Sequence, residues 1–269
     1  MQLWIWRYTL KPRRRLSALA RSGAREGALL RANDGFADIH PWPELGDAPL
    51  EVQLARLARG EILPALHHAR VDAEARARGV SLFDGLTIPE SHWPGDNPPP
   101  AFDTAKLKGI DSIPPRVQLR IDFNATLTAD EFLRIAETLP RDRVDFIEDP
   151  CPHVSNQLRK SAGLRVALDR AEGVADVLIY KPALSEVFPE FAGEIVVTSY
   201  MDHPVGQFHA AYVAATHAVN PRCGLFTHVL YEPNEFIESI RSDGARLLAP
   251  HGTGIGFDDL LERLPWQRL

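Results

Sequence analysis

The sequence has little cysteine and no long apolar run. Its two cysteines, Cys151 and Cys223, are too few for the disulfide framework of a small secreted domain, so we expect free thiols in a reducing cytoplasm. No apolar run approaches the length of a membrane span. Residues 1–7 lack the apolar core and the small-residue cleavage site of a secretion signal. These absences predict a cytoplasmic protein that does not enter a membrane.

The chain also lacks a strong excess of either charge. Its net charge of −6 gives no reason to expect nucleic acid as a partner. Hydrophobic residues make up 45% and charged residues 25%, which indicates a globular protein rather than a disordered one. With 269 residues the chain is long enough for one large α/β domain, or for a barrel with a small appendage.

Residues 1–95 are predicted to form a small α+β domain. Residues 11–16 carry four basic side chains in a turn, which we interpret either as a solvated loop or as an electrostatic lure for an anionic substrate. The domain's other elements are two segments with strand alternation and two with helical spacing, at residues 3–10, 25–39, 50–59 and 62–77.

A proline-rich stretch at residues 92–100 marks the boundary to a second domain, residues 96–269. Strands that alternate with helices imply a mostly parallel sheet, and chemistry at one edge of several units favours a (β/α) barrel over an open sheet. We keep open that the C-terminal end of the chain returns to the first domain. The helix candidates of the second domain are residues 129–138, 155–161, 206–219 and 234–240.

Three successive apolar runs of the second domain end on an acid, and the next one ends on a lysine. The acids are Asp122, Glu148 and Asp169, and the lysine is Lys181. One such acid alone is more often a helix cap or a turn residue, but three in succession are harder to explain in that way. Carboxylates without a partnering His or Cys suit Mg²⁺. The pattern predicts one metal and one cation that face each other.

Two lysines, Lys106 and Lys108, precede these acids. On a strand their spacing places both ammonium groups on one face, although this motif alone is more often found on a solvated edge. A divalent ion can stabilise the enediolate that forms when a base removes the proton α to a carboxylate. A lysine can be that base when burial and neighbouring cations lower its pKa.

Together these motifs resemble the ordered signature of the enolase superfamily, muconate-lactonizing subgroup. Within it, the segments that begin at Arg120 and at Lys181 are similar to the o-succinylbenzoate synthase family of menaquinone biosynthesis. The resemblance covers residues 102–256 and implies a TIM-type barrel, with residues 1–95 in the position of the superfamily's capping domain. The motifs are Lys106-x-Lys108, Asp122-x-Asn124, Glu148-Asp149-Pro150, Ala167-Leu168-Asp169 and Tyr180-Lys181-Pro182.

The resemblance implies a hydro-lyase that dehydrates a small cyclohexadiene carboxylate to o-succinylbenzoate. Lys108 would remove the α-proton and then assist departure of the hydroxyl, and Lys106 would favour the neutral form of Lys108. Lys181 would stabilise the anion from the opposite face, while Arg120 and Ser199 would border the substrate. Mg²⁺, or Mn²⁺ as its substitute, would be held by Asp122, Glu148 and Asp169, and no organic cofactor is implied.

Two intervals are short for a complete barrel. Asp122 follows Lys108 by 14 positions (122 − 108) and Lys181 follows Asp169 by 12 (181 − 169), too few for two strand ends and a full helix. We therefore expect a trimmed barrel in which at least two crossover helices are missing or reduced to a turn. After the third acid, family members usually have Glu-Ser, whereas this chain has Arg170 and Ala171.

Three other functions compete with the dehydratase. An N-acylamino acid racemase or dipeptide epimerase of the same superfamily would use both Lys108 and Lys181 as proton carriers. A metal-free Schiff-base enzyme would use Lys181 as its nucleophile. A non-catalytic, barrel-derived binding protein is disfavoured because no key position is lost. Monomer and dimer both stay open.

Smaller features receive simpler interpretations. We interpret Asp202 and His203 as a surface turn, with a position at the active site just past Ser199 as the alternative. We interpret Cys151 as a packing residue. The glycine-rich run at residues 252–256 resembles the family's late glycine-rich segment, and a plain flexible loop is an equal alternative.

Overall fold

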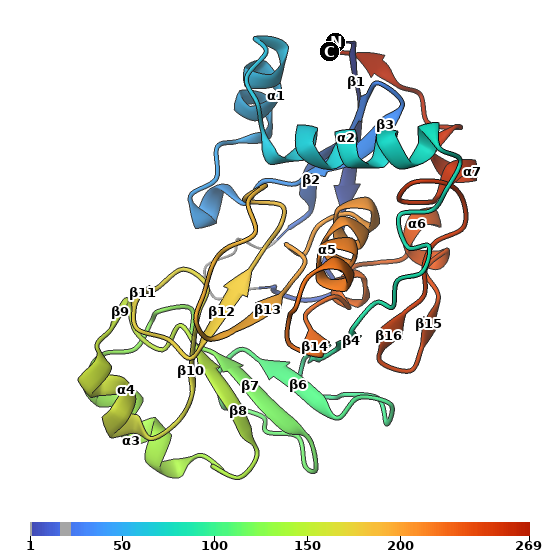
Figure 1. Ribbon diagram of the computed structural model, residues 1–269. Helices are drawn as coiled ribbons and strands as arrows, with labels where there is room; N and C mark the ends of the chain where they lie inside the picture. The colour runs from blue at the N-terminus through green and yellow to red at the C-terminus, as the bar shows by residue number, and fades with distance from the viewer. Residues whose placement is uncertain (1, 17–22) are drawn as a thin grey trace.

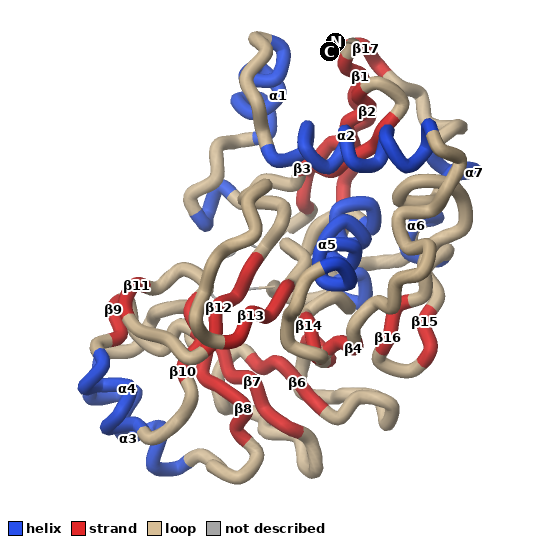
Figure 2. The backbone as a smooth tube through the Cα atoms, in the orientation of Figure 1, coloured by secondary structure: helices blue, strands red, loops and turns tan. Residues whose placement is uncertain are grey.

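The computed structural model describes residues 2–16 and 23–269. A sheet with two helices lies at one end of the molecule and a strand barrel at the other, as Figure 1 and Figure 2 show. We call the first part the cap and the second the barrel. The two chain termini lie side by side at the cap (Figure 1).

The cap is a four-stranded antiparallel sheet with two helices. Its elements are β1 (Leu3–Leu10), β2 (Arg25–Ala32), β3 (Gly35–Ile39), the 3-10 helix η1 (Pro43–Leu45), α1 (Leu50–Ala58), α2 (Pro64–Ala77) and β17 (Gln267–Arg268). The strand order is β17-β1-β2-β3, so the C-terminal strand joins the cap. Asn33 and Asp34 both have positive φ, as a tight two-residue hairpin turn between β2 and β3 requires. Leu30, Leu54 and Ala69 belong to the core that the sheet shares with the helices.

The barrel is built on a seven-stranded parallel sheet of order β13-β12-β10-β8-β7-β6-β5. Its strands are β5 (Trp93–Pro94), β6 (Thr104–Leu107), β7 (Gln118–Asp122), β8 (Val144–Glu148), β10 (Val166–Leu168), β12 (Val177–Tyr180) and β13 (Glu194–Val197). This confirms the expected parallel α/β architecture. Because the strands are parallel, their carboxyl ends meet at one end of the barrel.

Short pairings close this sheet into a ring. A parallel bridge between Thr198 and Gly224 leads from β13 to β14 (Arg222–Cys223), which pairs with β4 (Glu90–Ser91). Only His92 separates β4 from β5. Strands β6 and β12 therefore stand on opposite sides of the ring, with β7, β8 and β10 between them on one side.

Helices cover the barrel unevenly. The remaining elements are β9 (His153–Val154), β11 (Glu172–Gly173), β15 (Ser242–Asp243), β16 (Arg246–Leu247), α3 (Ala129–Thr138), α4 (Asn156–Ala162), α5 (Pro204–Thr216), the 3-10 helix η2 (Thr227–Leu230), α6 (Glu235–Glu238) and α7 (Asp258–Leu261). Helix α3 begins at a capping box between Thr128 and Glu131, and its Phe132 packs on the sheet beside Ile121. Residues 108–117 and 169–176 hold no helix, so the expected trimming of two crossovers is confirmed.

The barrel starts earlier than the expected boundary after residue 95. Strands β4 and β5 already pair with barrel strands, so residues 90–94 belong structurally to the barrel.

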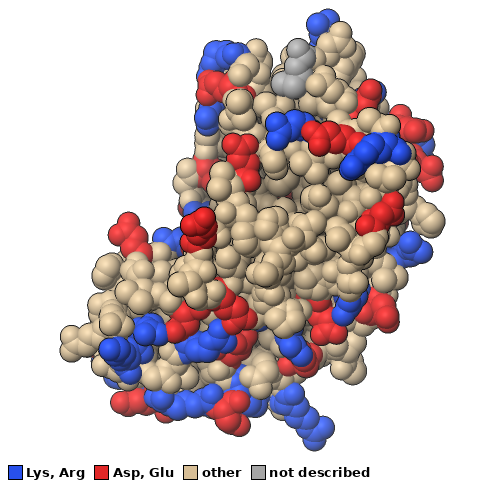
Figure 3. Space-filling view, in the orientation of Figure 1, with Lys and Arg blue, Asp and Glu red and all other residues tan. Residues whose placement is uncertain are grey.

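The face in Figure 3 shows basic and acidic side chains interspersed around a largely uncharged centre, without a broad patch of one sign. None of the helices in the described ranges has the length and apolar character needed to span a bilayer.

The glycine-rich run packs tightly on the cap instead of forming a loose loop. Asp72 of α2 is fully buried and accepts hydrogen bonds from the backbone N–H groups of Phe36, at 2.7 Å, and Ile255, at 2.5 Å. Gly254 has a φ of +55°, and a Cβ there would lie 2.0 Å from Asp72 Oδ1. Only glycine therefore fits where this segment meets α2.

Replacing Asp72 by alanine is expected to destabilise the fold. The change leaves two buried N–H groups without their acceptor and removes the 2.7 Å ion pair with Arg76. Loss of one partner of a buried pair costs about 3–5 kcal/mol. Urea unfolding measures the loss, with the exposed Asp142→Ala as the matched control. A loss no larger than that of the control would contradict the role of Asp72.

Candidate active site

A cavity of about 430 Å³ lies where the carboxyl ends of the barrel strands meet the cap. The sequence-predicted lysines and carboxylates reach it from the ends of five strands, and the cap contributes Arg14, Arg15, Leu16 and Leu45. Such a volume suits a small organic substrate. The predicted site residues that line it are Lys106, Lys108, Asp122, Glu148, Asp169, Lys181 and Ser199.

The lysines at the end of β6 pair with carboxylates of the next two strands. Lys106 Nζ lies 2.6 and 2.5 Å from the two carboxylate oxygens of Glu148 and 3.2 Å from Asp122 Oδ2. Lys108 Nζ lies 2.5 Å from the same Asp122 oxygen. At the end of β12, Lys181 makes an ion pair with Asp169. Three lysines thus neutralise three carboxylates around one cavity.

Crowding shifts the proton affinities of these groups. Burial and the neighbouring charge of Asp122 raise the pKa of Glu148 to about 8. Burial also disfavours the charged forms of Asp122 and Lys106. Their ion pairs outweigh it, holding the pKa of Asp122 well below its usual range and raising that of Lys106. A cation bound between these buried carboxylates would reduce their mutual repulsion.

Asp149, the residue after Glu148, holds the third carboxylate in place. Its own carboxylate accepts backbone hydrogen bonds from Asp169 at 2.9 Å, Arg170 at 2.9 Å and Ala171 at 3.2 Å. These bonds fix the chain where it leaves β10. Asp149 belongs to one of the sequence motifs, but the sequence gives no sign of its role because the three donors lie some twenty positions further along the chain.

The three carboxylates fit a divalent cation by their donor chemistry. No group of three His, Cys, Asp or Glu side chains in residues 2–16 and 23–269 is already arranged to hold a metal ion. In this site each carboxylate is turned toward a lysine instead. Three hard oxygen donors on one cavity match the donor preference of Mg²⁺ or Mn²⁺.

The two predicted substrate-bordering residues differ in position. Ser199 lines the cavity, and its hydroxyl forms a 2.6 Å hydrogen bond with the hydroxyl of Thr227. Arg120 is 1% exposed and does not line the cavity. Its guanidinium donates to Asp145 at 2.8 Å and to His92 Nδ1 at 3.0 Å. Arg120 therefore reaches the cavity only through His92, and its geometry gives no support to a substrate contact.

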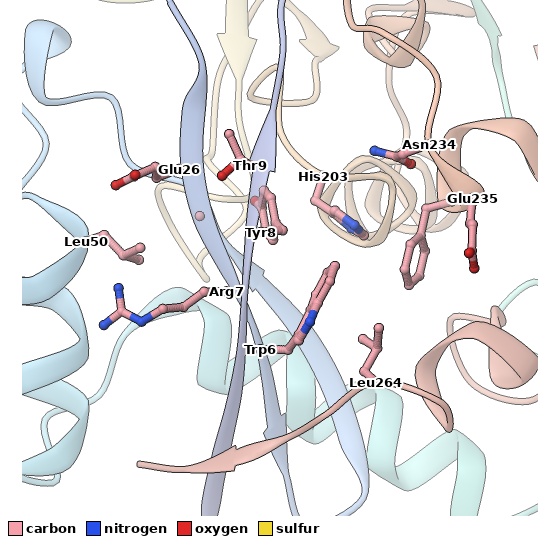
Figure 4. A pocket seen from close by; sticks show the side chains of 12 residues that line it. Trp6, Arg7, Tyr8, Thr9, Glu26, Leu50, His203, Asn234, Glu235 and Leu264 are labelled. Atoms are coloured by element: carbon pink, nitrogen blue, oxygen red, sulfur yellow. The ribbon is translucent and has the colours of Figure 1, made fainter.

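A larger cavity, of about 540 Å³, lies away from the catalytic side chains. Figure 4 shows Trp6, Tyr8 and His203 gathered on one side of β1. None of the predicted lysines or carboxylates lines it, so this cavity is not the active site. Asp202 and His203 are 2% and 1% exposed, which makes the expected surface turn wrong: His203 N donates to Asp38 of the cap at 3.0 Å.

A buried histidine joins the cap to the strand end that carries Lys181. His68 of α2 lies 3.0 Å through Nε2 from the carbonyl oxygen of Pro182, so Nε2–H is the donor. Burial lowers the pKa of His68 from 6.5 to about 3. The folded state therefore resists protonation of this ring.

His68→Gln is expected to make stability less sensitive to acid. A histidine pKa that is depressed on folding contributes stability that is present above pH 6.5 and falls as pH drops toward 3. Between pH 6.5 and 5 the wild type should lose about 2 kcal/mol more than His68→Gln, which keeps an N–H donor but does not titrate. Urea unfolding across this range measures the difference. Parallel pH curves for the two proteins would contradict it.

Comparison with known sequences points to one family. Residues 3–75 match the family model described as O-succinylbenzoate synthase, N-terminal domain. The chain is 34% identical to an o-succinylbenzoate synthase from Bdellovibrio bacteriovorus, over 97% of each protein. It is 25% identical to an o-succinylbenzoate synthase from Thermobifida fusca, over 76% of this chain and 74% of that protein.

Solved structures share the fold. The L-Ala-D/L-Glu epimerase from Bacillus subtilis superposes with a TM-score of 0.74 at 13% identity, over 95% of this chain and 98% of that one. An enolase-superfamily member from Enterococcus faecalis V583 reaches 0.75 at 15% identity, over 100% and 98%. These likenesses establish the cap-and-barrel architecture. With 34% identity shared over 97% of its length, the chain belongs to the o-succinylbenzoate synthase family and is an enzyme of the carbon–oxygen lyase class.

Proposed function

We propose that this enzyme is an Mg²⁺-dependent o-succinylbenzoate synthase, a dehydratase that removes water from a cyclohexadiene carboxylate. One observation carries the proposal. Lys108 and Lys181 belong to strand ends on opposite sides of the ring, and the strands between them supply the three carboxylates. A planar acid in this cavity has a base on one face and a cation on the other.

Lys108 performs both proton transfers of the dehydration. Its neutral amine takes the proton α to the carboxylate and becomes an ammonium group. That ammonium then gives a proton to the departing hydroxyl, so one water leaves and the amine returns. A single lysine suffices when it can reach both the α-proton and the departing hydroxyl. Lys106, on the same face of β6, supports the anion as a fixed positive charge.

Lys181 acts from the other side as a stationary cation. Its side chain is 12% exposed and lies with Asp169 at the cavity wall, where water is largely excluded. A charge in such surroundings stabilises a developing anion more strongly than one in open solvent. Asp122, Glu148 and Asp169 would hold the divalent ion, which when bound supplies Lewis-acid stabilisation of the substrate carboxylate.

Basic residues of the cap support an anionic substrate. Arg14 and Arg15 line the cavity from the segment that was interpreted as a solvated loop or an electrostatic lure, and Arg170 lines it from the barrel. This positive side favours a substrate with a second carboxylate on its side chain. We further propose, from the family resemblance, a role in menaquinone biosynthesis in the cytoplasm. We also propose a division of the chain near residue 95 into cap and barrel domains, in which β4 and β5 pair with the barrel and the C-terminal strand β17 pairs with the cap.

A dipeptide epimerase or N-acylamino acid racemase is the second candidate. The same opposed pair, Lys108 and Lys181, would let one lysine remove a proton and the other return one to the opposite face. Solved epimerases share the fold at 13–14% identity. This candidate requires Lys181 to exchange protons, whereas the dehydratase needs it only as a charge.

Proton NMR in deuterated water separates the two reactions. The purified enzyme with Mg²⁺ is given the diene acid in one tube and an N-acylamino acid or dipeptide in another. The dehydratase yields new aromatic proton signals from the diene acid. Solvent deuterium at the α-carbon of the amino acid, with no aromatic product in the first tube, would overturn the dehydratase in favour of the epimerase.

A further inference from the structure

Tyr200 follows Ser199 at the end of β13 and touches both halves of the molecule. The whole residue is 1% exposed. The Nζ atom of Lys181 lies 5.5 Å from the centre of its ring, within the range of a cation–π contact. Its hydroxyl accepts a 2.6 Å hydrogen bond from Arg170 Nη2 and donates at 2.8 Å to Asp47 Oδ2. No motif pointed to this tyrosine in the sequence.

The cap side of these contacts is one short segment, residues 42–47. Trp42 at its start donates from Nε1 to the carbonyl oxygen of Tyr200 at 3.0 Å and from its backbone N–H to Asp47 at 2.8 Å. Arg170 also donates to the carbonyl oxygen of Leu45. Leu45 lines the catalytic cavity. The distance between this cap segment and the barrel therefore determines the volume that a substrate can occupy.

The barrel side of the same contacts is the catalytic machinery. Arg170 directly follows Asp169, and its backbone N–H is held by Asp149 at 2.9 Å. Lys181 pairs with Asp169. The two barrel side chains that Tyr200 contacts through its hydroxyl and its ring, Arg170 and Lys181, are therefore joined to the third carboxylate by a peptide bond and by an ion pair.

We propose that Tyr200 is a positioning residue that couples the seat of cap segment 42–47 to Lys181 and Asp169. Through its hydroxyl, Tyr200 fixes the position of cap segment 42–47 and with it the position of Leu45 at the cavity wall. Through its ring face, it fixes the position of the Lys181 ammonium group. Arg170 links the hydroxyl of Tyr200 to the carbonyl oxygen of Leu45, because its guanidinium donates to both. The effect on turnover rests on the proposed function, whereas the effect on the cap segment does not.

Two substitutions of Tyr200 separate its two contacts. Tyr200→Phe keeps the ring but removes the hydroxyl, so the KM for the diene acid should rise about tenfold while kcat changes less than about threefold. Tyr200→Leu removes the ring as well, so kcat should also fall, about tenfold. A residue that served only stability would lower the folded fraction in both variants without this split. Tyr212→Phe, a half-buried tyrosine on α5, is the matched control.

Hydrogen exchange read by mass spectrometry tests the cap contact without any substrate. In Tyr200→Phe the amides of residues 42–47 should exchange at least about tenfold faster than in wild type, while those of α3 stay unchanged. Asp47→Ala, which acts from the cap side, should give the same local change and covers the case in which Tyr200→Phe fails to fold. Unchanged exchange at residues 42–47 would overturn the proposal. If the wild-type protein shows no turnover, only the proposed function is contradicted. The positioning role of Tyr200 is still decided by the exchange result.

Discussion

Lys108→Ala is expected to lower kcat for dehydration of the diene acid by at least about 10⁴-fold. General acid–base catalysis by one group contributes about 10²–10⁴-fold, and Lys108 is assigned both the removal of the proton and its return to the leaving group. The geometry supports the assignment because Lys108 Nζ lies 2.5 Å from Asp122 at the cavity wall and its side chain is 38% exposed. Because the Lys108 amine is exposed to the cavity, it can contact a substrate bound there.

The control for this variant is Lys160→Ala, which removes an exposed lysine of α4 and should leave the rate unchanged. Circular dichroism and the unfolding midpoint show whether Lys108→Ala is folded. The assignment fails if the folded variant keeps more than about a hundredth of the wild-type kcat.

Glu148→Gln is expected to abolish binding of the divalent ion and turnover with it. Glu148 is the central carboxylate, on the strand between those of Asp122 and Asp169, and it is 1% exposed. Loss of an outer partner of a metal ligand costs about 10–100-fold in affinity, so loss of the ligand itself should cost more. Titration of the protein with Mn²⁺, followed by calorimetry, measures the affinity directly.

The matched control for Glu148→Gln is Glu137→Gln on the exposed face of α3. It should bind Mn²⁺ as the wild type does. Unaltered Mn²⁺ affinity in folded Glu148→Gln would show that the ion, if it binds, uses other ligands.

Local sequence signals were sufficient for most of the elements and for the grouping of the catalytic side chains. Helix α3 was predicted at residues 129–138 and has those bounds, because Thr128 and Glu131 form a capping box. Asp122, Glu148 and Asp169 were expected together because the carboxyl ends of successive parallel strands meet. The 14- and 12-residue intervals also sufficed to predict the missing helices, since they are too short to hold one.

Features that depend on contacts between distant segments could not be predicted from the sequence. Arg120 was placed beside the substrate by motif, whereas its partners at Asp145, Asn220 and the Arg222 carbonyl draw it into the barrel interior. Asp202 and His203 looked like a surface turn, yet the cap covers them. The burial of these residues depends on which element packs over them. Neither local periodicity nor motif spacing contains that information.

The cap shows the same limit. Its strands and helices followed from alternation and helical spacing, but the contact of Tyr200 with Asp47 joins residues far apart in the chain. The glycine run at residues 252–256 carried no local sign of its partner, Asp72. Tertiary packing decided both.

The most direct test of the proposed chemistry is the ultraviolet absorbance of the diene acid mixed with the purified enzyme. Three samples are compared: wild type with Mg²⁺, wild type with a chelator, and Lys108→Ala with Mg²⁺. The account predicts rapid loss of the diene band in the first sample alone. Equal loss of the band in the chelated sample or in the Lys108→Ala sample, or no loss in the first, would contradict it.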